Sequence, residues 1–292
     1  MSYHYTRGRQ IAELHQIAMS EDAPDISYAA RMLYHTMIPH SPQEAREWTR
    51  ENGRWKVHMQ AGPGKGLPYG TYPRLIFIWL VTEAKRTQDR KLYLGDSLSH
   101  FMYQLGLMPT GGRWGSITQL RQQVQRLFTA RIIAFDAQED GERMRKLDVA
   151  DDYDLWWNQK HPEQGTLWQS SVVLGERFFN MIVDDPFPVD MRILKAIKRS
   201  PLGIDLYTWL TYRVSYLHKP VAISWRQLHA QFGADYSSDK NGMDSFTKKA
   251  KRELKKIQLA WPDLAYETPR GRLLLHPSEP SVKRQLKARQ EG

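Results

Sequence analysis

The sequence contains no cysteine at all. This absence excludes disulfide bonds, zinc ribbons and catalytic thiols, and it fits a protein that works in a reducing compartment. No uninterrupted apolar run approaches the roughly 18 residues that a membrane span requires. The N-terminal segment MSYHYTRGRQ also lacks the apolar core of a signal peptide. The sequence therefore predicts a cytoplasmic protein without a membrane partner.

The motif of a nucleotide-hydrolysing phosphate loop is also missing. That loop requires Gly-x-x-x-x-Gly-Lys-Ser/Thr. Gly64–Lys65 comes closest, but Met59 stands where the first glycine belongs and Gly66 follows the lysine. We interpret the surrounding turn-rich segment, residues 61–70, as a flexible hinge.

Sites for metal-dependent chemistry are equally hard to find. Rolling-circle nickases and relaxases hold a metal with two histidines one residue apart, and the ten histidines include no such pair. Two clusters of acids lie in turn-like segments and are interpreted as solvated surface: Asp151, Asp152 and Asp154, and Asp184 with Asp185. No Gly-x-Ser-x-Gly motif is present either. We therefore predict no catalytic residue, no metal site, no cofactor and no enzymatic activity.

Positive charge is the property that the chain has in excess. Among its 292 residues, 42 lysines and arginines face 32 acids, which gives a formal net charge of +10. A basic surplus of this size on a soluble protein points to a polyanionic partner, and nucleic acid is the first candidate.

The order of predicted elements occurs twice along the chain. Each copy reads helix, short strand, helix, turn, helix and hairpin, which is the order of a winged helix-turn-helix. The first copy comprises 72–88, 92–94, 97–105, 116–130 and 132–146; the second comprises 206–217, 221–223, 224–232, 243–257 and 264–275. The predicted fold class is thus mainly α with small β wings (α+β), built as two tandem winged helix-turn-helix domains.

Domain boundaries follow from this repeat. We expect a first winged-helix domain over 61–183, a second over 189–278, and a short proline-containing linker, Asp184–Pro188, between them. Residues 1–60 are predicted to be an extension partly packed on the first domain, with a short helix over 27–38. Residues 279–292 are predicted to be a mobile charged tail.

The third helix of the first copy has the composition of a base-reading helix. Its apolar residues form one stripe: Ile117, Leu120, Val124, Leu127 and Phe128. Its opposite face has amide and guanidinium groups and no acid: Thr118, Gln119, Arg121, Gln122, Gln125 and Arg126, preceded by Arg113. Glutamine can bond adenine and arginine can bond guanine in the major groove. A solvated face is the alternative, although such a face normally mixes Glu with its cations.

The third helix of the second copy has a different outward face. Phe246, Ala250, Leu254 and Ile257 are predicted to point inward. Six cations meet one acid, Glu253, across 248–256: Lys248, Lys249, Lys251, Arg252, Lys255 and Lys256. Lysines bind phosphates well but discriminate bases poorly. We therefore expect this helix to supply affinity while the first supplies discrimination; a plain basic surface remains the alternative.

Two predicted hairpins carry further cations. Arg143, Arg145 and Lys146 lie in one, and Arg270 and Arg272 lie in the other. Contacts to phosphates or to the minor groove are one interpretation. Ordinary polar hairpin tips are the other.

Several segments resemble one family. These are GLPYGTYPR (66–74), LGDSLSHFMYQLGLMPTGGRWGSITQLRQQVQRLF (94–128), IDLYTWLTYRVSYL (204–217) and QLHAQFGADY (227–236). They resemble the RepA-type replication initiators of bacterial plasmids, which are related in architecture to TrfA and other iteron-binding initiators. The resemblance covers about residues 60–276, and TGGRWG is its most specific element.

The resemblance implies a sequence-specific double-stranded DNA-binding initiator that binds direct repeats (iterons) at a plasmid origin. Such proteins help to open the duplex and recruit the host initiator DnaA and the replicative helicase, and related ones repress their own promoters as homodimers. A transcriptional repressor that binds one operator is the alternative function. A DNA nickase or relaxase is a remote one.

Overall fold

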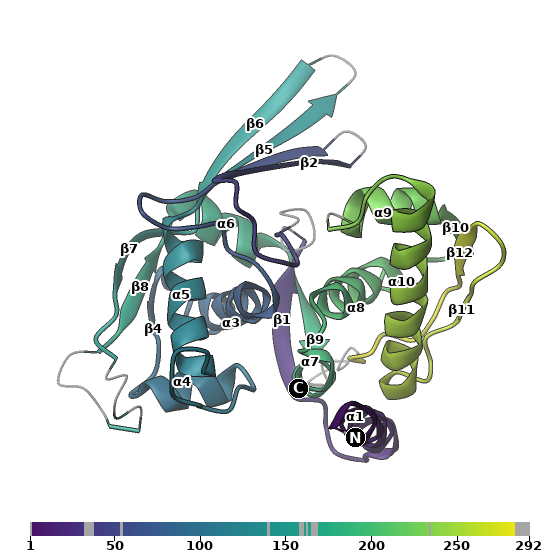
Figure 1. The fold of residues 1–292 in the computed structure, drawn as a ribbon, viewed down its shortest axis with the longest axis horizontal. Helices are drawn as coiled ribbons and strands as arrows, with labels where there is room; N and C mark the ends of the chain where they lie inside the picture. The colour runs from purple at the N-terminus through teal and green to yellow at the C-terminus, as the bar shows by residue number, and fades with distance from the viewer. Residues whose placement is uncertain are drawn as a thin grey trace, which may run out of the picture.

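The structure, a computed structural model, describes residues 2–31, 38–52, 55–138, 141–157, 161, 163–164, 169–233 and 235–283. Two groups of helices lie side by side in Figure 1, each with its own small sheet. One continuous apolar core runs through both groups.

The first group is a winged-helix unit. Its elements are α3 (Thr71–Thr87), β4 (Lys91–Tyr93), α4 (Leu98–Gln104), α5 (Ser116–Thr129), β7 (Ala150–Asp154) and β8 (Ser171–Leu174). The helix α3 is buried along most of its length, and α4 begins where the Ser97 side chain accepts a hydrogen bond from the His100 amide. The three strands form an antiparallel sheet in the order β4-β8-β7.

The second group repeats this topology. It contains α8 (Pro201–Val214), β10 (Val221–Ser224), α9 (Trp225–Phe232), α10 (Lys240–Ala260), β11 (Tyr266–Glu267) and β12 (Arg272–Leu275). Its sheet has the order β10-β12-β11. In both sheets the last strand along the chain, β8 or β12, lies in the middle. A capping box between Ser224 and Gln227 starts α9. The predicted fold class, α+β with two tandem winged-helix units, is confirmed.

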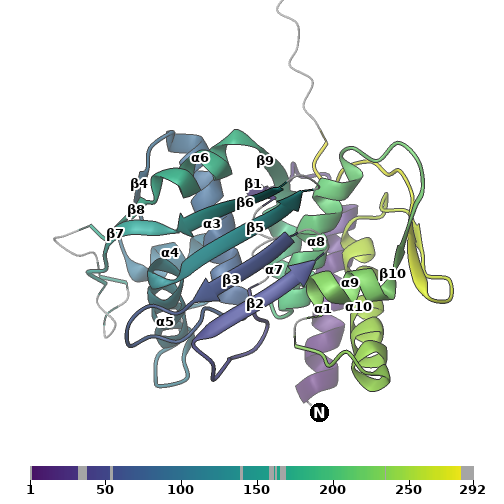
Figure 2. The same cartoon turned by 90° about the horizontal axis from the view of Figure 1, so that it is seen from above.

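The hairpin predicted over 132–146 exists, but it does not form the wing of the first unit. It consists of β5 (Arg131–Gln138) and β6 (Gly141–Asp148), and it joins β2 (Glu47–Asn52) and β3 (Trp55–Gln60) in a sheet of order β2-β3-β5-β6 (Figure 2). The strands that pair with β4 are β8 and β7, further along the chain. Local sequence specified a hairpin correctly, but only tertiary pairing decided which sheet it entered.

The N-terminal extension contacts both halves. The helix α1 (Ser2–Met19) packs against α10 and α7 (Met191–Ile197), with Leu14 fully buried and the Gln10 amide donating to the Ala196 carbonyl at 2.7 Å. The prediction that the extension packs partly on the first domain does not cover α1, whereas residues 26–30 contact α3 and the strand β3 pairs with β5. Residues 26–30 form the strand β1 (Ile26–Ala30) rather than the predicted helix over 27–38, of which 32–37 lie outside the described residues.

The segment predicted as a linker is part of a sheet. Asp184 ends α6 (Glu176–Asp184), and β9 (Pro186–Asp190) follows at once and pairs antiparallel with β1. Arg31 forms an ion pair with Asp185 at 2.8 Å. The short proline-containing segment predicted as a linker thus connects α6 to α7 as a paired strand.

Further contacts join the two units. The Arg50 side chain on β2 donates to the carbonyls of His229 and Ala230 at 3.3 and 2.9 Å, at the end of α9. Its burial lowers the pKa of Arg50, and the charge of Asp235 acts in the opposite direction. A buried ion pair also links α3 with α8. These contacts hold the two units in one fixed arrangement.

The predicted mobile tail begins with residues that are in fact packed. Val282 is buried, the Trp261 indole donates to the Glu279 carbonyl at 2.9 Å, and the Ser281 hydroxyl lies 3.1 Å from that of Tyr207. Residues 284–292 lie outside the described residues.

Candidate nucleic-acid interface

The apolar stripe of α5 faces the core as predicted. Ile117, Leu120, Val124, Leu127 and Phe128 are all buried. The prediction of an amphipathic helix in this position is confirmed. Its outward face, however, is divided between two structural roles.

The C-terminal half of that face holds the segment 61–70. The Arg126 guanidinium donates to the Leu67 carbonyl at 3.2 Å and lies 5.2 Å from the centre of the Tyr69 ring. The Tyr69 amide donates to the buried Gln123 side chain at 2.9 Å. The Lys65 ammonium donates to Gln125 at 3.2 Å. The segment interpreted as a flexible hinge is thus fastened to α5, and Arg126 is half-buried rather than free to read a base.

The N-terminal half organises the preceding loop. The Thr118 hydroxyl donates to the Gly112 carbonyl at 3.0 Å, and the Gln119 amide donates to the Trp114 carbonyl at 3.0 Å. Gln122 is exposed and Arg121 is half-buried. Among the residues predicted on this helix, Gln122 is therefore the one most open to a ligand, with part of Gln119 beside it.

The inward residues of α10 are placed as the sequence predicts. Phe246, Ala250, Leu254 and Ile257 are fully buried. Glu253, which lies between them, is also fully buried. The sequence did not reveal this, because Glu253 looked like a single acid within a basic surface. Local pattern placed the apolar residues, but only the fold shows that this acid belongs to the core.

Glu253 takes up part of the positive charge of α10. Its carboxylate lies 3.2 Å from the Lys256 ammonium, 3.5 Å from that of Lys249 and 3.6 Å from Nε of Arg252. An uncompensated buried charge is costly, so these cations are needed for stability. The cations left for a phosphate backbone are Lys248 and Lys255, with the outward part of Arg252 and with Lys251, whose ammonium lies 5.5 Å from the Trp225 ring centre.

The beginning of α10 is acidic. Asp239 caps the helix by accepting from the Gly242 amide at 2.7 Å, and Asp244 is exposed one turn later. Hydrogen bonds from the Gly242 amide and the Ser237 hydroxyl lower the pKa of Asp239. In helix-turn-helix proteins the N-terminal residues of the recognition helix contact base edges. Negative charge there opposes contact with phosphates, so the cations that could meet a polyanion lie further along the helix.

The cations of β6 lie on two faces of the sheet. Successive side chains of a strand point to opposite faces, so Arg143 and Arg145 share the face of the buried Leu147, while Lys146 lies on the other. The three residues do not form the single cluster at a hairpin tip that the sequence suggested. In the second unit, Arg270 and Arg272 are exposed beside Gly271, which turns the hairpin with a φ of 83°.

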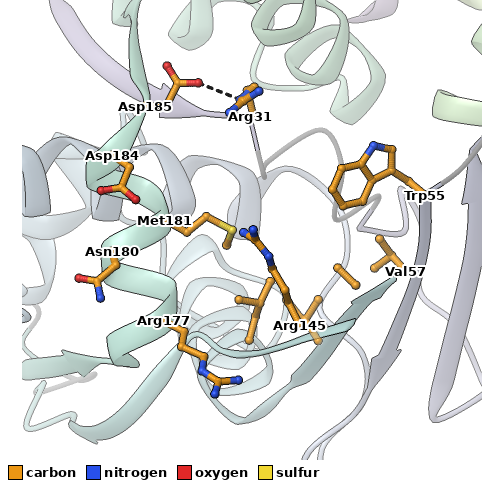
Figure 3. A pocket seen from close by; sticks show the side chains of 12 residues that line it. Arg31, Trp55, Val57, Arg145, Arg177, Asn180, Met181, Asp184 and Asp185 are labelled. Atoms are coloured by element: carbon orange, nitrogen blue, oxygen red, sulfur yellow. Dashed lines mark ion pairs between the residues drawn. The ribbon is translucent and has the colours of Figure 1, made fainter. Parts of the chain in front are cut away.

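Arg145 reaches into a cavity of about 640 Å³ between the four-stranded sheet and α6. Figure 3 shows its side chain extending from the sheet toward Met181, with the Arg31–Asp185 ion pair at the top of the view and with Trp55 and Val57 along one side. The cavity is lined by β3, β5, β6 and α6 and by no residue of α5 or α10. It is therefore separate from the outward faces of the two candidate recognition helices.

Two features are absent from the described residues. No three His, Asp or Glu side chains in this part of the chain lie close enough to hold a metal ion. No helix within it is long and apolar enough to cross a bilayer.

Comparisons with known proteins agree with the resemblance seen in the sequence. Residues 67–227 match the family model described as plasmid encoded RepA protein. The fold is similar to the crystal structure of RctB domains 2-3, with a TM-score of 0.51 and 13% identity over 83% of this chain and 94% of that one. It is also similar to a selenomethionine derivative of RctB domains 2 and 3, with a TM-score of 0.52 and 11% identity over 90% and 97%. At such identities the likeness shows the fold alone. A search of curated proteins gave no significant match.

Proposed function

Since this chain belongs to the family of plasmid-encoded RepA proteins, a family of replication initiators, we propose that it binds direct repeats in the double-stranded DNA of a plasmid origin. The observation that carries this proposal is the pair of winged-helix units with unlike outward helices. One presents an uncharged amide, Gln122, and the other presents a stripe of cations. A protein so built can combine base readout with phosphate binding in one chain.

We assign the two activities to different helices. Gln122 on α5 is exposed, and in this proposal it bonds a base edge, as glutamine does with adenine. Lys248, Lys251 and Lys255 on α10 lie three and four residues apart, on one side of the helix. Such a row can follow a phosphate backbone and release counterions when it binds. Specificity and affinity are thus separable by mutation.

The cations of the hairpins are secondary candidates in this proposal. Arg270 and Arg272 are exposed at the tip of the second wing, and in this proposal they contact phosphates or the minor groove. Lys146 lies on the outer face of the four-stranded sheet, while Arg145 is turned toward the cavity. We therefore expect Lys146 to contribute more to DNA binding than Arg145 does.

Opening of the origin also requires host proteins. We propose that the bound initiator recruits the host initiator DnaA and the replicative helicase, and that a homodimer represses its own promoter. The support for both is the family membership. We assign no surface of the chain to either contact.

Footprinting of the DNA on both sides of the gene tests the proposed function. Protection of several direct repeats is expected, and protection of a single operator would instead favour the repressor. The matched control is the double variant Lys251→Ala/Lys255→Ala, which should lose the footprint at moderate salt. Replication of an origin fragment in cells should require the wild-type protein; a fragment that replicates without it would contradict the initiator function.

The proposed function includes no chemistry on DNA. Supercoiled origin DNA incubated with pure protein, Mg²⁺ or Mn²⁺ and ATP should remain intact, and ATP should not be hydrolysed. Nicking that copurifies with the protein through successive columns would favour the nickase.

A further inference from the structure

Trp114 is the aromatic side chain most open to solvent in the described part of the chain, with an exposed fraction of 79%. It lies in the loop between α4 and α5, two residues before α5 begins. The neighbouring Arg113 places its guanidinium 5.2 Å from the indole ring centre. Other large apolar side chains of this unit are also exposed, among them Met108 at 68% and Tyr93 at 53%, and a single exposed apolar side chain needs no partner. Trp114 differs from them in its greater exposure and in the support that holds it, and an indole in water leaves a large apolar surface that a ligand can bury.

The loop that carries Trp114 is held in one conformation. The Ser116 amide donates to the Thr110 hydroxyl at 2.9 Å, and the Thr110 amide donates to the Ser116 hydroxyl at 2.9 Å. The Gly115 amide donates to the Gly112 carbonyl at 3.1 Å. A side chain at residue 115 would lie 2.2 Å from two loop carbonyls, so the chain closes more tightly than any other residue allows. The indole is therefore displayed by a fixed support rather than by a mobile loop.

Two polar residues of α5 also help to hold the loop that carries Trp114. Thr118 and Gln119 bind the carbonyls of Gly112 and Trp114, respectively. These are residues whose type suggests base reading, yet their hydrogen bonds go to the loop. The helix thus commits two of its outward side chains to fixing the position of the tryptophan.

The equivalent loop of the second unit has no such feature. Between α9 and α10 it carries Asp235 and Asp239, and its Tyr236 is half-buried with its ring 5.7 Å from that of Phe246. An exposed tryptophan is therefore not a requirement of the winged-helix fold. It is a property of the unit that we assign to base reading.

The location of Trp114 indicates its partner. The N-terminal end of a recognition helix enters the major groove, where its residues meet base edges. The apolar group on those edges is the 5-methyl group of thymine, which apolar and aromatic side chains contact. We propose that Trp114 contacts the 5-methyl group of one thymine in the cognate repeat and makes the chain specific for thymine at that position. This proposal rests on the proposed DNA binding of α5.

Single replacements of thymine by deoxyuridine test the contact, because they remove only the methyl group. The probes are fluorescent duplexes that carry one footprinted repeat, each with one thymine replaced, and affinity is measured by anisotropy. Wild-type protein should lose about fourfold in affinity at one position, the amount expected for burial of one methyl group. The Trp114→Ala variant should bind the thymine duplex about tenfold less tightly or worse, and it should be insensitive to deoxyuridine at that position.

Two further variants serve as controls. Trp114→Phe keeps an aromatic face and should restore part of both the affinity and the sensitivity to deoxyuridine. Met19→Ala removes an equally exposed apolar side chain, with an exposed fraction of 82%, from the end of α1 and should change neither. Unchanged thermal midpoints of all three variants would show that the fold is retained.

The outcomes separate this proposal from the proposed function. If wild-type protein binds the repeat specifically but Trp114→Ala binds as tightly, or keeps its sensitivity to deoxyuridine, the thymine contact is wrong and the initiator function stands. Equal losses by Trp114→Ala on the repeat and on random duplex would likewise overturn it. Absence of any specific binding by wild-type protein would overturn both.

Discussion

Arg74 and Asp205 form a two-point ion pair across the boundary between the two winged-helix units. Nε of Arg74 lies 2.6 Å from Oδ1 of Asp205, and Nη2 lies 2.8 Å from Oδ2. Only 1% of Arg74 is exposed, and its remaining hydrogens go to the carbonyls of Ile38, Pro39 and Gly70. Arg74 ends the segment GLPYGTYPR, and Asp205 lies in IDLYTWLTYRVSYL. Two of the segments that resemble the RepA family thus meet in this contact.

Removal of either partner should destabilise the whole chain. Arg74→Leu or Asp205→Leu leaves one buried charge without its counterion, which typically costs about 3–5 kcal/mol. Urea unfolding should show this loss for each single variant, and the double variant should lose less than the sum of the two. The exposed pair Arg86–Glu83 supplies a control, because Arg86→Ala should change the free energy of unfolding by about 1 kcal/mol or less. Strictly additive losses at Arg74 and Asp205 would contradict the coupling.

The same pair predicts a loss of stability in acid. Burial acts to raise the pKa of Asp205, but the charge of Arg74 and hydrogen bonds from His40 and Arg74 outweigh it and hold the pKa below its ordinary value. A carboxyl whose pKa is lowered by folding binds fewer protons in the folded state. Its stabilising effect is therefore present above roughly pH 4, the ordinary aspartate range, and is lost as the pH falls through the lower folded value. Between neutral pH and pH 3, the free energy of unfolding should fall more steeply for the wild-type protein than for Asp205→Asn. Parallel curves of unfolding free energy against pH would contradict this.

Two polar residues of α5 should respond differently to substitution. Gln122→Ala should cost about 1–3 kcal/mol of binding free energy on the cognate repeat and less on random DNA. Arg126→Ala should instead lower the free energy of unfolding by about 1–3 kcal/mol, because its guanidinium binds the Leu67 carbonyl. Anisotropy and urea unfolding distinguish the two effects. A loss of base discrimination by Arg126→Ala at unchanged stability would support the original interpretation of Arg126 as a base reader.

The lysines of α10 allow a test with a neighbouring control. Lys255→Ala should weaken binding to cognate and random DNA alike and reduce the slope of log affinity against log salt by about one unit. Lys256, whose ammonium pairs with the buried Glu253, should affect stability more than the salt slope when changed to Ala. Binding titrations at four or more salt concentrations give the slopes. Equal slopes for both variants would contradict the division of charge along this helix.

The shape of the DNA site is also predictable. Two unlike units in one chain impose no two-fold symmetry, so each repeat should be an asymmetric element of roughly 20 bp with reading helices about 10 bp apart. The units are joined by the buried Arg74–Asp205 ion pair and by the hydrogen bonds of Arg50, so we expect them to tolerate little change in spacing. Insertion of five base pairs into the middle of one repeat should abolish tight binding by the monomer. Undiminished affinity, or selection of a palindrome, would show that one unit reads alone or that a symmetric dimer binds.

Local pattern was reliable where the physical cause is itself local. The apolar stripe of α5 and the four inward residues of α10 follow from helical periodicity. The twofold repeat of winged-helix elements followed from the same signals. The roles of individual polar residues did not follow, because a glutamine that reads a base and a glutamine that holds a loop have the same side chain.

By itself the sequence determined the class of fold, the basic character, the lack of thiol chemistry and the resemblance to RepA-type initiators. Only the tertiary structure decided that β5 and β6 leave the wing for a separate sheet, that Asp184–Pro188 enters a helix end and a strand, and that Glu253 is buried. The physical reason is that strand pairing and burial depend on partners distant in the chain. Val57 on β3 faces Ala134 on β5, and no window of neighbouring residues contains both.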